Sequence, residues 1–317
     1  MENPDSKRRK AEVLGRRLRR GDFAAAARLL SQHALPAGRR ADAPSSPRGP
    51  MTLQEACGGR EIAVAAPDGQ ALVYQVGPAP LGGAEGGGIS GRYAVVLGGA
   101  GQRFDELAVS GGLCRAADAR PEDLLLVRFG TCRGKDAMVF LIGLASYEGG
   151  RLTCRQFLAR HPREEPGVLV AFAEARVAAG LIVTFGGQGG DLKRIRRRVD
   201  LHRIPRPDRP VPQLDLRAEA RGQWPNKPRK QLPDYSLATL ERLVLGRGRR
   251  RRHRVSPAAA AEAFGRFAVT QDAAPMADVL EANRLGLLSM AELLVLFLTG
   301  CDPRVGWHGP SEAPSGV

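Results

Sequence analysis

Two clusters of basic residues are the most concentrated source of chemistry in this 317-residue chain. Residues 193–209 hold eight lysines and arginines against two acids, a net charge of +6, and residues 247–254 hold six arginines and no acid, also +6. Residues 1–50 hold twelve basic residues against five acids, a net of +7, whereas the whole chain carries +15. The positive charge is therefore local, and local positive charge favours a polyanion such as nucleic acid. A general abundance of arginine in the composition is the alternative explanation.

Eight side chains in these clusters are candidate nucleic-acid contacts. The spacing of Leu192, Ile195 and Val199 predicts a helix that starts near Asp191 with its apolar face inward, which leaves arginines on another face. The second cluster is a run of arginines that we expect in a loop, where a solvated surface is the alternative interpretation. The candidate contacts are Lys193, Arg194, Arg197, Arg198, Arg249, Arg250, Arg251 and Arg252.

The cysteines and histidines predict no metal site. The five cysteines are Cys57, Cys114, Cys132, Cys154 and Cys301, and no two of them form a CxxC pair. An odd and scattered set of cysteines is typical of reduced thiols in the cytoplasm. The charged N-terminus has no apolar signal segment after it, and the apolar stretch 285–298 contains Glu292 and is too short to span a bilayer. We therefore expect a soluble cytoplasmic protein with no membrane partner.

Two short apolar runs form the expected centre of the fold. Leu124–Val127 and Ala137–Leu144 are joined by the Gly-containing segment Thr131–Asp136, a pattern that predicts two buried strands. Three further strands are expected at 152–157, 181–185 and 214–216, with helices from 164 to 179, from 191 and beyond 236. This alternation predicts an α/β fold in which helices flank a mixed five-stranded sheet.

Changes in composition divide the chain into four regions. Residues 1–50 are expected to be a basic N-terminal helix and linker, partly disordered, and residues 51–123 a small strand-rich lead-in. In this lead-in, strands are predicted at 61–66 and 70–76 around the turn Pro67-Asp68-Gly69, and another at 92–97. Residues 124–300 form the main domain, and residues 301–317 are expected to be a flexible tail.

Five segments of the main domain resemble the YprB-type branch of the DEDD 3′–5′ exonuclease superfamily, whose fold is ribonuclease H-like. The matching text is VFLIGLASYEGGRLTCRQFLARHPREEPGVLVAF (139–172), LIVTFGGQGGDL (181–192), LHRIPRP…QLDL (201–216), SLATLERLVLG (236–246) and VLEANRLGLLS (279–289). Their order and intervals fit that family. The resemblance implies a ribonuclease H-like mixed sheet and a nucleic-acid substrate.

The resemblance also implies four acidic residues that hold two divalent metal ions for phosphodiester cleavage. The first two family acids form an Asp-x-Glu at the end of the first strand, where this chain has Arg128 and Gly130. The third ends a pattern like TFNGKSFDL, and TFGGQGGDL keeps it as Asp191. The fourth ends a pattern like EHNRLD, and EANRLG places Gly286 there. One acid of four cannot anchor two cations, and the charge of Arg128 would repel Mg²⁺.

Several residues at this place have competing interpretations. Asp191 is either a remnant of the metal site or a helix N-cap, and we favour the cap. Arg128 is either a surface residue at a strand end or a partner of Asp191. The glycines from Gly186 to Gly190 either cradle a phosphate or fill positions released from constraint. Asp215 and Asp136 are the other acids considered as substitutes, and neither position is expected to bind metal.

The favoured hypothesis is a nucleic-acid-binding pseudoenzyme whose two-metal nuclease site is lost. This hypothesis requires no cofactor, and it favours a protein without enzymatic activity. One alternative is an active exonuclease with a rearranged site, which would need Mg²⁺ or Mn²⁺. The other is a structural module with a protein partner. The sequence leaves open DNA versus RNA and the oligomeric state.

Overall fold

The computed structural model describes residues 50–82, 87–99, 110–134, 137–206, 210–223, 232, 234–246 and 255–299. From residue 51 onwards, these residues belong to one compact unit, Met51–Val317. The expected basic extension, the C-terminal tail from 301 to 317 and the loop acid Asp136 lie outside the described residues.

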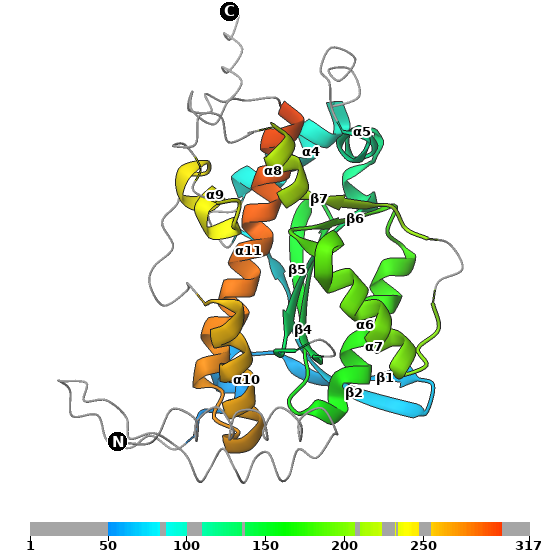
Figure 1. Cartoon of the computed structure of the whole chain (residues 1–317), viewed down its shortest axis with the longest axis vertical. Helices are drawn as coiled ribbons and strands as arrows, with labels where there is room; N and C mark the ends of the chain where they lie inside the picture. Colours follow the sequence, from blue (N-terminus) through cyan, green and yellow to red (C-terminus); the bar gives the residue numbers. More distant parts are fainter. Residues whose placement is uncertain are drawn as a thin grey trace, which may run out of the picture. The chain divides into compact units, whose positions relative to one another are not determined.

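A mixed sheet of seven strands in the order β1-β2-β5-β4-β3-β6-β7 forms the centre of the fold (Figure 1). The strands are β1 (Arg60–Ala66), β2 (Gly69–Pro80), β3 (Leu124–Thr131), β4 (Val139–Glu148), β5 (Arg151–Leu158), β6 (Leu181–Thr184) and β7 (Gln213–Asp215). Neighbours from β1 to β3 are antiparallel, whereas β3, β6 and β7 run parallel. The predicted mixed α/β class is confirmed. The predicted count of five strands is wrong, because β2 pairs with β5 and thereby adds the β1–β2 hairpin to the same sheet.

Helices cover both faces of this sheet. They are α3 (Leu53–Cys57), α4 (Gly87–Gly99), α5 (Gly111–Asp118), α6 (Glu165–Val177), α7 (Leu192–Leu201), α8 (Leu216–Gln223), α9 (Leu237–Leu243), α10 (Pro257–Thr270) and α11 (Ala274–Thr299), with short turns η4 (Pro121–Asp123), η5 (Pro162–Glu164) and η6 (Gly187–Asp191). Figure 1 shows α6 and α7 on one side of the sheet and α10 and α11 on the other.

The region 51–123 contains more helix than its sequence suggested. The segment 92–97, which was predicted as a strand, lies inside α4. Ile89, Tyr93 and Leu97 are buried at helical spacing, so the segment buries one stripe rather than alternate side chains. The strands predicted at 61–66 and 70–76 are confirmed as β1 and β2.

The alternating side chains of β3 divide the core into two clusters. Leu125 and Val127 pack in the cluster that includes α6 and α7, whereas Leu124 and Leu126 pack in the cluster that includes α4 and most of α11. Because successive strand residues point to opposite faces, Arg128 and Gly130 continue the face of Leu124 and Leu126. These two positions therefore face α11.

A buried polar network fixes α11 against the middle of the sheet. Gln156 on β5 donates from Nε2 to the Leu280 carbonyl at 2.8 Å and to Oδ1 of Asn283 at 3.0 Å. The amide of Asn283 also contacts the Arg128 carbonyl, at 3.5 Å. Gly143 on β4 lies between these strands, and a Cβ there would overlap Oδ1 of Asn283. The bare backbone at Gly143 thus lets Asn283 reach the sheet.

Helix α11 has 26 residues and is, within the described part of the chain, the one helix long and apolar enough to cross a membrane. It is longer than the 14-residue stretch considered in the sequence, because it begins at Ala274. In the fold, 72% of its most apolar window is buried. Burial of this kind is also what the core helix of a soluble protein shows.

We predict that Gly143→Ala lowers the free energy of unfolding by about 2 kcal/mol, because the added methyl overlaps Asn283 and overpacking in cores has this cost. Urea unfolding measures the change. Gly265→Ala in α10 is the matched control, since its Cβ meets no atom within 4 Å and helix propensity makes it neutral or stabilising. Adding Asn283→Ala to Gly143→Ala is expected to cost less than the two single changes together. A Gly143→Ala protein as stable as the wild type would contradict this account of α11.

Candidate functional site

The predicted site residues meet where the parallel strands end. Asp215 is the last residue of β7, Asp191 ends the turn that follows β6, and Arg128 lies just beyond the part of β3 that pairs with β6. Parallel strands place their carboxyl ends at one edge of a sheet. Arg128 and Asp191 were expected in the same region, and this is confirmed, because the charge of Arg128 acts on the pKa of Asp191.

The side chain of Arg128 lies over the backbone of Gly286 in α11. A Cβ built on Gly286 would overlap Nη1 of Arg128 and would lie 2.8 Å from its Nε. Arg128 lies near the end of β3 and is partly buried, so it is more enclosed than an exposed surface residue. Its guanidinium fills the space into which a side chain at position 286 would project.

Gly130 has little room for a side chain. A Cβ there would lie 2.9 Å from Cβ of Leu141 and 3.0 Å from the ring of Phe140. Real Cβ atoms do not approach other carbons this closely, so a larger residue requires both neighbours to shift. The position where the resemblance implies a glutamate is therefore closed by the packing of β3 on β4.

Asp191 occupies the favoured N-cap position of α7, but its side chain makes no capping hydrogen bond. Its Oδ1 instead accepts from Nη1 of Arg194 at 3.0 Å, and the same nitrogen donates to Oγ1 of Thr131 at 3.3 Å. Arg194 thus links the start of α7 to the end of β3. Burial raises the pKa of Asp191, while Arg194 and Arg128 oppose that rise and Asp215 adds to it.

Asp215 binds backbone amides at the same edge of the sheet. Its buried carboxylate accepts from the Gly186 amide at 2.7 Å and from the Arg217 amide at 3.0 Å. Gly186 has a left-handed backbone with φ of 76°, which glycine adopts without strain. The Gly186 amide, a candidate phosphate donor in the sequence, is therefore already bonded to Asp215.

These neighbours do not suit a pair of divalent cations. Two carboxylates, Asp191 and Asp215, lie with two guanidiniums, Arg128 and Arg194, whose charges offset theirs. Mg²⁺ prefers several carboxylate or carbonyl oxygens and water. Among the residues that the structure describes, no three His, Cys, Asp or Glu side chains come together as metal ligands. The site as built does not fit a two-metal centre.

The four candidate contacts on α7 fall into two classes. Lys193 and Arg197 are exposed. Arg194 pairs with Asp191, and Arg198 pairs with Glu165 of α6. The other four candidates, Arg249 to Arg252, lie outside the described residues.

Glu165 is the centre of the junction between α6, α7 and β4. Its carboxylate is 1% exposed, accepts from the Val139 amide at 2.8 Å and from Nε of Arg198 at 2.8 Å, and lies 3.0 Å from Nε2 of His202. Burial alone would raise the pKa of Glu165, but these partners together hold it below its ordinary value. Arg198 therefore has a structural partner inside the fold.

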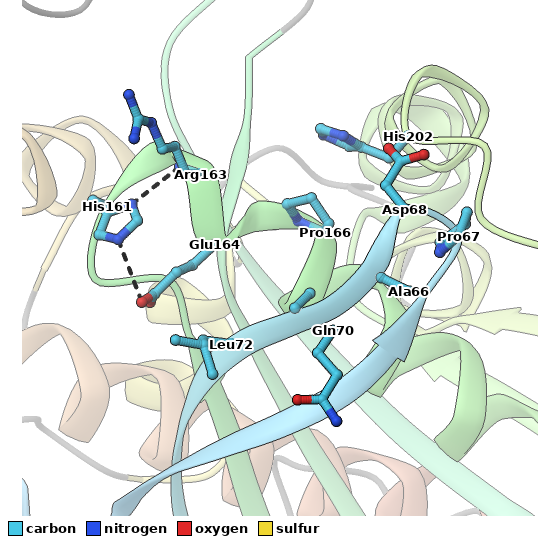
Figure 2. A pocket seen from close by; sticks show the side chains of 11 residues that line it. Ala66, Pro67, Asp68, Gln70, Leu72, His161, Arg163, Glu164, Pro166 and His202 are labelled. Carbon is cyan, nitrogen blue, oxygen red and sulfur yellow. Dashed lines mark hydrogen bonds and ion pairs between the residues drawn. The ribbon is translucent and has the colours of Figure 1, made fainter.

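A shallow pocket of about 250 Å³ lies beside this junction, between the β1–β2 turn and the start of α6 (Figure 2). His161 accepts from the Arg163 amide at 3.2 Å through Nδ1 and lies 3.5 Å from the Glu164 carboxylate through Nε2. Glu164 is also bonded to Arg160. The polar groups at this end of the pocket are thus paired with one another, and no predicted site residue lines it.

Sequence reasoning missed the contacts that shape the site. It singled out Arg128, Asp191 and Gly286 but not the link from Arg194 to Thr131. It also missed Gly143 and Asn283. A glycine inside a strand often marks a site where another element approaches the backbone closely. Gly143, inside a predicted strand, could have been recognised in this way.

A sequence profile described as the RNase H superfamily matches residues 130–298, which is more than half of the chain. The match begins at the end of β3, after Arg128, and ends in α11, so it includes β4 to β7 and the helix that faces Arg128. No curated protein matches this chain in sequence.

We predict that Glu165→Gln makes the protein less stable by about 3 kcal/mol at pH 7, because it leaves the largely buried Arg198 without its carboxylate. A carboxylate whose pKa is lowered by folding stabilises above its unfolded pKa, near 4.5, and that stabilisation is lost as the pH falls through the folded pKa. The two stability curves should therefore converge below pH 4.5. Denaturant unfolding across pH 3–7 measures this, with the exposed Glu174→Gln of the same helix as control. A constant gap at all pH values would contradict it.

Proposed function

The chain belongs to the ribonuclease H superfamily, and from this premise we propose that it is a nucleic-acid-binding member without the two-metal nuclease site. Within the superfamily we place it with the YprB-type exonuclease branch, on the resemblance of its five segments. The proposed role is that of a pseudoenzyme, a ribonuclease H-like scaffold that binds nucleic acid and does not cleave it. The proposed location is the cytoplasm, supported by the four cysteines of the described chain, which are free thiols.

The single observation that carries the loss of catalysis is the guanidinium of Arg128 over Gly286. The resemblance implies a carboxylate at both positions. Here position 128 has a guanidinium, and the glycine at position 286 leaves the space that this guanidinium fills. A fixed positive charge in this space disfavours a divalent ion by direct repulsion.

The surroundings of Asp191 support the same proposal. Its carboxylate is already paired with Arg194, so a metal ion would have to displace a guanidinium to reach it. Asp215, the other acid at this edge, is bonded to two backbone amides. Each carboxylate thus already has a partner on at least one of its oxygens.

The nucleic-acid part of the proposal rests on local charge. Lys193 and Arg197 are exposed on α7, and the sequence adds the basic segments 1–50 and 247–254. Phosphate contacts of this kind release counterions, so binding should weaken steeply with salt. Arg194 and Arg198 are the weaker candidates among the basic residues of α7, since each is paired with a carboxylate.

We predict that neither Mg²⁺ nor Mn²⁺ raises the melting temperature of the natural protein, and that it cleaves no oligonucleotide with either ion. The variant Arg128→Asp/Gly286→Asp removes the guanidinium and restores two acids beside Asp191. An ion at ten times its dissociation constant stabilises by about 1.4 kcal/mol. For a domain of this size that is a rise of about 3 °C, which differential scanning fluorimetry detects.

Arg128→Asn/Gly286→Asn is the matched control, because it has the same side-chain sizes without the negative charge. It should show no rise with divalent ions. Gly130 is left unchanged in both variants, since the packing of Phe140 and Leu141 leaves no room for glutamate. Divalent-dependent cleavage by the natural protein, abolished by Asp191→Ala, would instead favour the active exonuclease with a rearranged site.

We also predict that replacing Arg249, Arg250, Arg251 and Arg252 together by Ala weakens binding to oligonucleotides of unrelated sequence by a similar factor. Each phosphate that the variant no longer neutralises should reduce the slope of log affinity against log salt by about 1. Fluorescence anisotropy with labelled single- and double-stranded oligonucleotides at several salt concentrations measures both quantities. An unchanged slope would assign this run to a solvated loop.

A further inference from the structure

Three arginines gather where the last turn of α6 meets α7, away from the ends of the parallel strands. Arg176 lies in that last turn, and Arg196 is exposed on α7. Asp200 follows Arg196 by one helical turn and pairs with Arg206, which places Arg206 along the same stripe of α7. Helices α6 and α7 pack against each other here, and the charges of Arg196 and Arg206 both act on Arg176.

Arg176 is the unusual member of this group. Its side chain is partly buried, and its Nε is fully buried with no hydrogen-bond partner in the described part of the chain. Burial lowers the pKa of Arg176, and the charges of Arg196 and Arg206 lower it further. The acid nearest in sequence to this stripe, Asp200, is already paired with Arg206. Buried polar atoms normally have a hydrogen-bond partner, so the Nε of Arg176 is a buried donor left without an acceptor among the described residues.

We infer that Arg176 and Arg196 form a phosphate-binding cluster that takes the sugar–phosphate backbone of a nucleic acid. Arg206, whose ion pair with Asp200 is exposed, is the weaker member of this cluster. This inference rests on the proposed function and adds to it a specific surface, the α6–α7 face, and residues that charge counting did not single out. Guanidiniums suit this ligand because their planar fork of donors matches two phosphate oxygens at once.

The position of the cluster fits an extended ligand. Lys193 and Arg197 are exposed on the same helix as Arg196, so the positive surface continues along α7 beyond the three arginines. Successive phosphates of a nucleic-acid backbone provide a row of anions for such a strip. A compact anion would occupy one part of the strip only.

A purely structural role for Arg176 predicts the opposite effect on stability from a binding role. If Arg176 held α6 to α7, its removal would destabilise the domain. If it is kept for a ligand, Arg176→Gln relieves repulsion among like charges, and the melting temperature should stay equal or rise. Binding and stability are thereby separated in one variant.

The test uses the full chain, with Arg176→Gln/Arg196→Gln as the variant and Arg115→Gln/Arg266→Gln as the control. Arg115 and Arg266 are exposed on α5 and α10, so the control removes the same charge elsewhere. Anisotropy with a labelled single-stranded oligonucleotide is measured from 50 to 200 mM salt. We expect about a tenfold loss of affinity at the low-salt end and a salt slope lower by about 1 to 2 in the variant, with less than a twofold loss in the control.

The outcomes separate the proposed function, nucleic-acid binding, from the more specific inference that the α6–α7 arginines carry it. If the natural chain binds no oligonucleotide, the proposed function and this inference are both wrong. If it binds and the variant has the same affinity and slope, or if Arg176→Gln lowers the melting temperature by several degrees, only this inference is wrong. If polyglutamate of matched charge displaces the oligonucleotide from the natural chain as well as an unlabelled oligonucleotide does, the cluster recognises acidic protein and the nucleic-acid assignment is overturned.

Discussion

The close approach of α11 to the sheet is the constraint on which the strand-end site depends. Gly143 gives Asn283 access to the strands, and Gln156 holds that asparagine by a hydrogen bond of 3.0 Å. Gly286 lies one turn further along the helix and therefore comes close to the end of β3. With the helix fixed at this distance, positions 128 and 286 share one space. A long side chain fits at Arg128 only because Gly286 has none, so positions 128 and 286 are coupled by geometry.

The same geometry places positive charge beside the acids at this edge of the sheet. Buried carboxylates at neighbouring strand ends repel one another, and Asp215 indeed raises the pKa of Asp191. In this chain the guanidinium of Arg194 joins Asp191 to Thr131, and Arg128 adds a second positive charge. An arginine is charged at every physiological pH, so its positive charge is always present. The cation that balances the acids is thus part of the chain itself.

The sequence allowed the central strands to be predicted better than the site. Continuous apolar runs such as Leu124–Val127 are specific for strands buried on both faces, and those predictions are confirmed. The prediction of a strand around Tyr93 was wrong, because a short apolar segment fits either a strand or the buried stripe of a helix. Asp191 lies at the predicted N-cap position, but its carboxylate bonds to Arg194 and not to the α7 backbone, which the local sequence does not indicate. The contact of Arg128 with Gly286 joins distant segments, and no local pattern indicates it.

The clearest limit of sequence reasoning concerns how charge is counted. Helix α7 carries five basic residues, and a helical-wheel argument separates all of them from the apolar stripe of Leu192, Ile195 and Val199. Two of the five nevertheless turn inward to carboxylates, Arg194 to Asp191 and Arg198 to Glu165. These two contribute to the net charge of +6 in residues 193–209, but each already has a carboxylate partner. Salt dependence counts only the phosphates that a protein neutralises, so the basicity of a segment sets an upper bound on its contacts. Acids on neighbouring elements determine which arginines remain unpaired. In this fold, Glu165 of α6 pairs with Arg198 and so directs its guanidinium into the fold.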